Sequence, residues 1–368
     1  MSLNYSELAV EGVRSLKPYQ PGKPIDELAR ELGLNEEDIV KLASNENPLG
    51  PSPKALDAIR KEFDELTRYP DGAGFELKKT LCEKLGTSPE QLTLGNGSSD
   101  ILDFIVRVFV NDGDDVVFSE HAFAIYGLVA KMVGANCIVT PAKNYGHDLE
   151  AMASAITDRT KIVFVTNPNN PTGTWLGAEP LKTFIDKVPK NVIVVVDEAY
   201  NEYVTDGSIP NTIEWLSDYP NLVVTRTFSK AYGLASLRLG YAATSEEICG
   251  LLNRVRQPFN VNSFALAAGI AVLDDQAYLD KAVQVNQSGM QQLVENCQQL
   301  SLEHIPSAGN FLTIDMGQNA MPIYEKLLHM GVIVRPVANY SMPNHLRVSI
   351  GLEIENQKYI DSINKILG

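Results

Sequence analysis

Short apolar runs alternate with helical patterns between about residues 90 and 245. The candidate strands are residues 116–118, 137–140, 161–168, 191–197, 221–227 and 237–244. These runs are continuous rather than alternating, as in strands that a parallel sheet buries on both faces. Between them, SSDILDFIVRVFV carries an apolar helical stripe and opens on Ser and Asp capping candidates. The pattern predicts an α/β domain with helices on both faces of a mostly parallel sheet.

The pattern changes after about residue 250. A long helical stretch containing NQSGMQQLVENCQQL precedes the candidate strands NFLTID, VIVRPV and HLRVSI and two further helices. We therefore predict a second, smaller α+β domain. The predicted division is an N-terminal arm that is part of the small domain (1–44), a large domain (45–275) and a small C-terminal domain (276–368). The Pro- and Gly-rich stretch KPYQPGKP is expected to reach back over the small unit or a cleft.

Composition and charge narrow the class of protein. The hydrophobic share of 44% and charged share of 21% are close to average globular usage, so a large core is available. A net charge of -15 without a basic stripe argues against nucleic-acid binding, which requires clustered Lys and Arg. An anionic ligand would therefore be held by a few local cationic side chains and backbone amides, which makes single arginines informative.

The four cysteines indicate neither a metal site nor a disulfide framework. Cys82, Cys137, Cys249 and Cys297 lie far apart, with no CxxC pair and no histidine at metal-ligand spacing. We expect reduced core thiols and no metal. The N-terminus lacks the basic and apolar regions of a secretory signal, and no run of about 20 apolar residues could span a membrane. The expected location is the cytoplasm.

A lysine follows one of the buried strands, with a serine and an arginine close to it in the sequence. In TRTFSKAYGLASLRLGY, Ser229 and Lys230 come directly after the strand, and Arg238 stands eight residues beyond the lysine. A lysine at a strand end is usually solvated. Burial and a neighbouring arginine would lower its pKa, which makes the amine a nucleophile toward an aldehyde while the arginine binds an anion.

A carboxylate ends the apolar strand VVVDEAY. Asp197 could simply cap the next turn, which is a common use of aspartate. At the end of a buried strand, however, a carboxylate loses favourable solvation free energy unless it pairs with a positive group. A protonated pyridine nitrogen is such a group, and Tyr200, three residues on, could donate to a phenolate oxygen of the same ring.

The turn NPNNPTG follows another strand. Taken alone it indicates a rigid loop, in which proline makes a cis bond accessible at Asn170–Pro171. Asp197 and Lys230 follow neighbouring strands, and ligands collect beyond the carboxyl ends of such strands. Asn170 is therefore a second candidate donor to the phenolate.

Two further segments could contact the same ligand. In LGNGSSDILDF a glycine turn opens a helix, so Gly97, Ser98 and Ser99 could present amides and hydroxyls to a phosphate. In EHAFAIYG, Phe123 could stack on a planar ring or belong to the core. Neither segment is specific by itself.

Together these motifs resemble a known family. NPNNPTG, DEAY and SKAYGLASLRLGY are similar to the signatures of the fold-type I, class II aminotransferases, which use pyridoxal 5'-phosphate, from about Lys17 to the C-terminus. PYQPGKP, KLASNENPLGPSP, YPDG, LGNGSSD, RQPFNVN and LRVSIG narrow the resemblance to the histidinol-phosphate aminotransferases of histidine biosynthesis. His121 and Ser236 depart from the commonest wording of that family, and neither replaces a catalytic group.

The resemblance implies a role for each cofactor residue. Lys230 would bind the cofactor as a Schiff base, Asp197 would pair with its pyridinium, and Tyr200 and Asn170 would donate to its phenolate oxygen. Phe123 would stack on the ring. The residues implied at the cofactor phosphate, beside the Gly97 turn, are Ser98, Ser99, Thr227, Ser229 and Arg238.

The resemblance also implies the substrates and a partner. The reaction would be a ping-pong transfer from glutamate, which leaves as 2-oxoglutarate, to imidazole acetol phosphate, which becomes histidinol phosphate. Arg347 would clamp the α-carboxylate of glutamate, and Arg335 and Tyr19 would surround the substrate phosphate. Asn45 and Asn310 would complete the pocket. Tyr69 would reach the cofactor phosphate of a neighbouring subunit, which implies a homodimer.

Rival functions remain at this stage. An aromatic-amino-acid aminotransferase, or an enzyme like threonine-phosphate decarboxylase, would share Lys230, Asp197 and Arg238. A regulator built on such a domain is a rival of another class. That class predicts an added DNA-binding module or a lost lysine, and the sequence shows neither.

Overall fold

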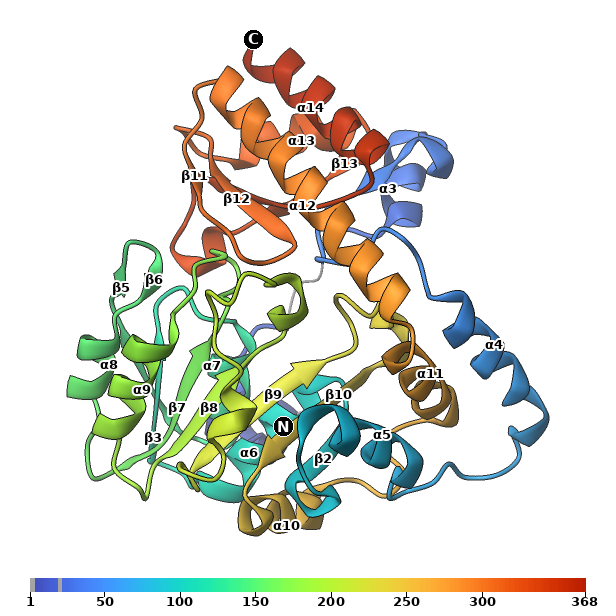
Figure 1. The fold of residues 1–368 in the computed structure, drawn as a ribbon. Helices are drawn as coiled ribbons and strands as arrows, with labels where there is room; N and C mark the ends of the chain where they lie inside the picture. Colours follow the sequence, from blue (N-terminus) through green and yellow to red (C-terminus); the bar gives the residue numbers. More distant parts are fainter. Residues whose placement is uncertain (1–3, 19–21) are drawn as a thin grey trace.

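The computed structural model describes residues 4–18 and 22–368 and consists of two units (Figure 1). A large unit surrounds a seven-stranded sheet, and a smaller unit surrounds a four-stranded sheet. The α-helices are α1 (Tyr5–Leu8), α2 (Glu11–Arg14), α3 (Ile25–Leu32), α4 (Pro53–Lys61), α5 (Phe75–Leu85), α6 (Ser98–Phe109), α7 (Ile125–Met132), α8 (Leu149–Ser154), α9 (Ala178–Lys187), α10 (Glu246–Val255), α11 (Ser263–Leu273), α12 (Gln276–Gln299), α13 (Met321–His329) and α14 (Glu353–Leu367).

The strands of the large unit form a mixed, mostly parallel sheet, as predicted. They are β2 (Leu92–Asn96), β3 (Asp115–Ser119), β4 (Asn136–Thr140), β7 (Thr160–Thr166), β8 (Ile193–Asp197), β9 (Leu222–Thr227) and β10 (Leu239–Thr244). Their order is β2-β10-β9-β8-β7-β3-β4, and β10 runs in the direction opposite to the other six. All six apolar runs form strands. A hairpin of β5 (Ala142–Lys143) and β6 (Gly146–His147) lies beside this sheet.

Helices cover both faces of this sheet because its strands are apolar on both faces. On β7, Ile162 and Phe164 pack in the cluster that contains residues of α6, α7 and α10. Val163 and Val165 pack in the opposite cluster, with residues of α5, α8, α9 and α11. Such burial explains the continuous apolar runs. The prediction of two-sided burial is wrong for β4, since that strand is at the edge of the sheet and is only partly buried.

The small unit has the order β11-β12-β15-β14 and packs against α12, α13 and α14. Its strands are β11 (His304–Ile305), β12 (Phe311–Asp315), β14 (Arg335–Pro336) and β15 (His345–Ser349). The predicted strand VIVRPV divides in two: β13 (Val332–Ile333) pairs with β1 (Val40–Lys41), and β14 pairs with β15. The N-terminal segment thereby joins the small unit. The exact domain limits, at residues 44/45 and 275/276, stay a prediction.

The cysteines do not all lie in the core. All four are free, with Cys249 and Cys297 buried. Cys82 and Cys137 are only partly buried and pack against the two core clusters of the large unit, so the expectation of core thiols is confirmed in full only for Cys249 and Cys297. Within residues 4–18 and 22–368, no helix has the length and apolar character needed to cross a membrane.

Replacement of Phe164 by alanine should lower the free energy of unfolding by about 3–5 kcal/mol. The ring is fully buried and stacks on Tyr126 with ring centres 4.3 Å apart, so the change opens a cavity between the sheet and α7. Urea denaturation measures the difference. Ile354→Ala is the control, since that side chain is 76% exposed and its loss should change the free energy by only about 0.5 kcal/mol. Equal losses in both variants would contradict the proposed core.

Candidate active site

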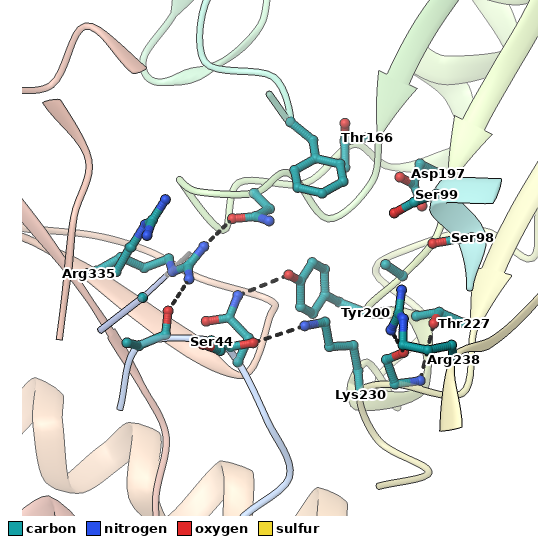
Figure 2. Close-up of a pocket in the computed structure, with 18 residues that line it drawn as sticks. Ser44, Ser98, Ser99, Thr166, Asp197, Tyr200, Thr227, Lys230, Arg238 and Arg335 are labelled. Carbon is teal, nitrogen blue, oxygen red and sulfur yellow. Dashed lines mark hydrogen bonds between the residues drawn. The ribbon is translucent and has the colours of Figure 1, made fainter. Parts of the chain in front are cut away.

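A pocket of about 280 Å³, partly open to solvent, lies where the carboxyl ends of the large-sheet strands face the small unit. Figure 2 shows Arg335 on one side of it and Ser98, Thr227 and Arg238 on the other, with Lys230 between them. The predicted residues that line the pocket are Asn45, Ser98, Ser99, Phe123, Asn170, Asp197, Tyr200, Thr227, Ser229, Lys230, Arg238, Arg335 and Arg347. Residues from widely separated stretches of the chain thus meet here.

Three predicted residues do not line the pocket, and a fourth is not among the described residues. Gly97 supports the pocket from behind, next to Arg238. Asn310 is buried, and its side-chain amide donates to the backbone oxygen of Asn45 at 3.0 Å, so it lies behind the wall of the pocket. Tyr69 is 82% exposed and stacks on Phe259. The fourth, Tyr19, falls outside the described part of the chain.

Lys230 follows β9 and points into the pocket. Its Nζ donates to the backbone oxygen of Ser44 at 3.1 Å and lies 5.8 Å from the centre of the Tyr200 ring. Burial lowers the pKa of Lys230 to about 8, and the positive charge of Arg347 acts in the same direction. The amine is therefore much more often neutral, and so nucleophilic, than an exposed lysine.

Asp197 ends β8 at the floor of the pocket. Its Oδ2 accepts a hydrogen bond from the Tyr126 hydroxyl at 3.0 Å, and that hydroxyl is 2.7 Å from Thr166 Oγ1. Its Oδ1 is buried and has no hydrogen-bond partner among the described residues. Burial raises the pKa of Asp197 to about 6. The carboxylate is thus arranged to meet a cationic group that enters the pocket.

Gly97, Ser229 and Arg238 form a site suited to an anion, the anion cradle, where α6 begins. Gly97 has φ +83°, and a Cβ at this position would come within 2.4 Å of Arg238 Nη2, so the guanidinium packs directly on the glycine. Arg238 Nη1 donates to Ser229 Oγ at 3.3 Å. The helix N-terminus adds its own attraction for an anion. The predicted capping by Ser or Asp is wrong: Gly97 is the N-cap, and Asp100 accepts from the backbone N–H of Asn96 instead.

The ends of β8 and β9 are joined behind the pocket by a buried ion pair. Arg226 Nη2 lies 2.7 Å from Glu198 Oε2, and the side chains are 7% and 0% exposed. Asn211 Oδ1 accepts a further bond from Arg226 at 2.7 Å. Glu198 directly follows Asp197, and Arg226 directly precedes Thr227. The pair therefore ties together the two strand ends that carry these pocket residues.

Two arginines of the small unit complete the pocket. Arg335 on β14 and Arg347 on β15 are direct partners in the strand register. Arg347 donates to Asn170 Oδ1 and to the backbone oxygen of Ala43, both at 2.6 Å. Adjacent guanidinium groups at one end of a pocket favour anionic ligands. The prediction that both arginines lie on adjacent strands of the small unit is confirmed, and their role in substrate binding stays a prediction.

Several residues of the site carried no signal in the sequence. The pocket is also lined by Gly22, Ala43, Ser44, Thr166 and Ala199. Tyr126 lies on α7 among apolar residues and therefore resembles a core tyrosine in sequence. Only the tertiary structure brings its hydroxyl to Asp197.

Comparison with known proteins identifies the family of the chain. The model of the family "Aminotransferase class I and II" matches residues 37–363. The chain belongs to this family of aminotransferases. Among its relatives are histidinol-phosphate aminotransferase 2 of Pseudomonas fluorescens, 57% identical over 100% of this chain and 99% of that protein, and histidinol-phosphate aminotransferase 1 of Idiomarina loihiensis, 55% identical over 99% of each.

Solved structures share the fold of this aminotransferase. Histidinol-phosphate aminotransferase from Sinorhizobium meliloti, in complex with pyridoxal-5'-phosphate, has a TM-score of 0.89 and 30% identity over 97% of this chain and 98% of that one. Aspartate aminotransferase from Thermus thermophilus, with maleate, has a TM-score of 0.83 and 21% identity, over 97% and 98% of the two chains, and supports the fold alone. The aminotransferase thus has the predicted fold-type I architecture.

In this aminotransferase, freed of any bound aldehyde, acetic anhydride should acetylate the amine of Lys230. The rate of acetylation should rise with pH and reach half of its maximum near pH 8. The lowered pKa results first from burial and then from Arg347. Competitive labelling at a series of pH values, with mass spectrometry of the Lys230 peptide, measures the midpoint. Arg347→Gln should move it upward, since a repelling charge is lost. A midpoint near 10.5 in the parent would show that the amine is an ordinary, solvated lysine.

Proposed function

We propose that this aminotransferase transfers the amino group of glutamate to imidazole acetol phosphate, with pyridoxal 5'-phosphate as cofactor. One observation carries the proposal: a lysine of lowered pKa lies between an anion cradle at Arg238 and a second cationic end formed by Arg335 and Arg347. A phosphorylated cofactor and an anionic substrate need such a pair of sites. The names of the relatives at 57% and 55% identity support the choice of substrate.

The residues of the pocket fit pyridoxal 5'-phosphate. The buried Oδ1 of Asp197 would receive the pyridinium N–H. Tyr200 and Asn170 would donate to the phenolate oxygen, and Phe123 would lie against the ring. The phosphate would be held beside Gly97 by Ser98, Ser99, Thr227, Ser229 and Arg238. When bound, the cofactor supplies an electron sink that stabilises negative charge at the substrate α-carbon.

Lys230 is the catalytic base and acid in this proposal. With its pKa near 8, Nζ is able to take a proton from the α-carbon and to return it near neutral pH. Asp197 keeps the ring nitrogen protonated, because a buried carboxylate strongly favours a cation beside it. The walls formed by both units would limit the access of water to the reacting atoms.

The substrates would bind at the arginine end. Arg347 would clamp the α-carboxylate of glutamate through a bidentate pair. Arg335 would bind the phosphate of histidinol phosphate, together with Tyr19. Asn45 lines the same side of the pocket. The first half-reaction would release 2-oxoglutarate, and the second would release histidinol phosphate.

The proposal includes a homodimer in the cytoplasm. Tyr69, which lies away from the pocket of its own chain and is highly exposed, would contact the cofactor phosphate in the partner's site. Phe259, which stacks on Tyr69, and Phe75, six residues further along the chain, are also exposed. Exposed aromatic side chains are typical of a surface that a protein partner covers.

The cofactor-loaded protein should convert histidinol phosphate faster than phenylalanine, and threonine phosphate should not lose carbon dioxide. A half-reaction with histidinol phosphate and with phenylalanine, followed by the visible absorbance of the cofactor, compares the two amino donors, and carbon dioxide released from threonine phosphate is measured separately. Lys230→Ala is the control and should lower the rate by a factor of roughly 10²–10⁴ or more, since proton transfer is lost. Equal rates with phenylalanine would reject histidinol phosphate as the substrate.

Arg335→Gln should raise KM for histidinol phosphate by roughly 10-fold or more and change KM for glutamate much less. A charge-assisted hydrogen bond to a phosphate is lost, whereas the α-carboxylate still meets Arg347. Steady-state kinetics in both directions separate the two effects. Arg347→Gln is the matched variant, and its larger effect should be on glutamate. If both variants impair the two substrates equally, the two arginines do not have separate roles.

A further inference from the structure

Asn45 occupies a strained and fully enclosed position at the edge of the pocket. Its φ is +53°, in the left-handed region that non-glycine residues rarely adopt, and it is only 1% exposed. Asparagine tolerates this region better than most residues, but the conformation persists only where neighbours hold it. The neighbours of Asn45 therefore indicate what the conformation serves.

All four polar groups of Asn45 are engaged. Its backbone N–H donates to Ser349 Oγ at 2.8 Å, and the Ser349 hydroxyl donates back to Asn45 Oδ1 at 2.9 Å. Its backbone oxygen accepts from Asn310 at 3.0 Å. Three groups are thus fixed by the small unit. The fourth, the Nδ2 amide, donates to the Tyr200 hydroxyl oxygen at 2.9 Å.

The bonds to Ser349 determine which way round the Asn45 amide lies. Since Oδ1 accepts from Ser349, the end that faces Tyr200 is the N–H₂ group, which can only donate. The Tyr200 oxygen must then accept from Asn45, and its own proton points toward another acceptor. A hydroxyl that accepts one hydrogen bond is polarised and becomes a stronger donor.

We propose that Asn45 is a positioning residue that turns the Tyr200 hydroxyl proton toward the bound cofactor and strengthens that donor. The inference rests on the proposed function, because the acceptor is the phenolate oxygen of pyridoxal 5'-phosphate. Asn45 is thereby given a role other than direct contact with substrate. It also links β15, which carries Arg347 two residues before Ser349, to the catalytic Tyr200.

The charges around Tyr200 are compatible with this role. Burial raises the pKa of Tyr200 to about 12, and Arg347 and the bond from Asn45 oppose that rise. The charged groups facing the ring are Arg347 on β15, Asp197 at the end of β8 and Lys230 after β9. A tyrosine with this pKa keeps its proton at neutral pH, so it can act only as a donor to the cofactor while Asn45 occupies its oxygen.

Asn45→Gly tests the proposal, because glycine adopts the same φ without strain and removes only the side chain. The readout is the pH midpoint of the visible absorbance of the bound cofactor, which reports the proton on the nitrogen linked to Lys230. A weaker donor at the phenolate oxygen leaves this proton more tightly held. The midpoint should therefore rise by roughly 0.3–1 pH unit, the size expected for one neutral hydrogen bond.

Two matched controls isolate the pathway through Tyr200. Asn144→Gly makes the same change at another asparagine of positive φ, +50°, which is exposed and outside the pocket, and should leave the midpoint unchanged. In a Tyr200→Phe background, Asn45→Gly should cause no further shift, because the hydroxyl on which it acts is gone.

The possible outcomes are distinct. A rise that depends on the Tyr200 hydroxyl supports the proposal, whereas no rise, or an equal rise in both backgrounds, overturns it. If Asn45→Gly does not fold, Asn45→Ala also removes the amide donor without adding a charge, and the same comparison applies. A parent protein that shows no visible absorbance after addition of pyridoxal 5'-phosphate would instead overturn the proposed function itself.

Discussion

The carboxyl ends of β7, β8 and β9 meet at one edge of the sheet, and the position of every reactive group depends on that meeting. Parallel strands with helices on both faces have no free face, so a ligand can approach only from the ends. Thr166, Asp197 and Thr227 are the last residues of these strands. The buried pair Arg226–Glu198 holds two of the ends together from behind.

At this edge of the sheet, burial shifts the pKa values of Asp197 and Lys230 in opposite directions. It raises the pKa of Asp197 and lowers that of Lys230. Each shift makes the neutral form more accessible in the free protein, and each would be relieved by a ligand that brings the missing charge or forms a bond to the amine. The same desolvation thus prepares the carboxylate for a cation and the amine for a carbonyl.

The sequence predicted the large sheet and most of the pocket because the relevant signals are local. A continuous apolar run that ends in Asp197, or in the segment before Lys230, contains both the strand and the reactive group. Tyr126 could not be found in this way, since its role depends on α7 packing against β7. The division of VIVRPV between β13 and β14 could not be predicted either, because the segment is continuous in sequence. Only the pairing of its two parts with β1 and β15 separates them. Asn310 was assigned to the pocket, and the structure places it one layer behind.

Arg335 and Arg347 are opposite one another on paired strands of the small unit. Backbone hydrogen bonds of a sheet fix the offset between the Cα atoms of such partners. The two guanidinium groups therefore start from neighbouring backbone positions, while the rotatable bonds of each side chain let them adjust separately. One pair of strands can thus present positive charge to two anions of different size and shape, a carboxylate and a phosphate, in turn.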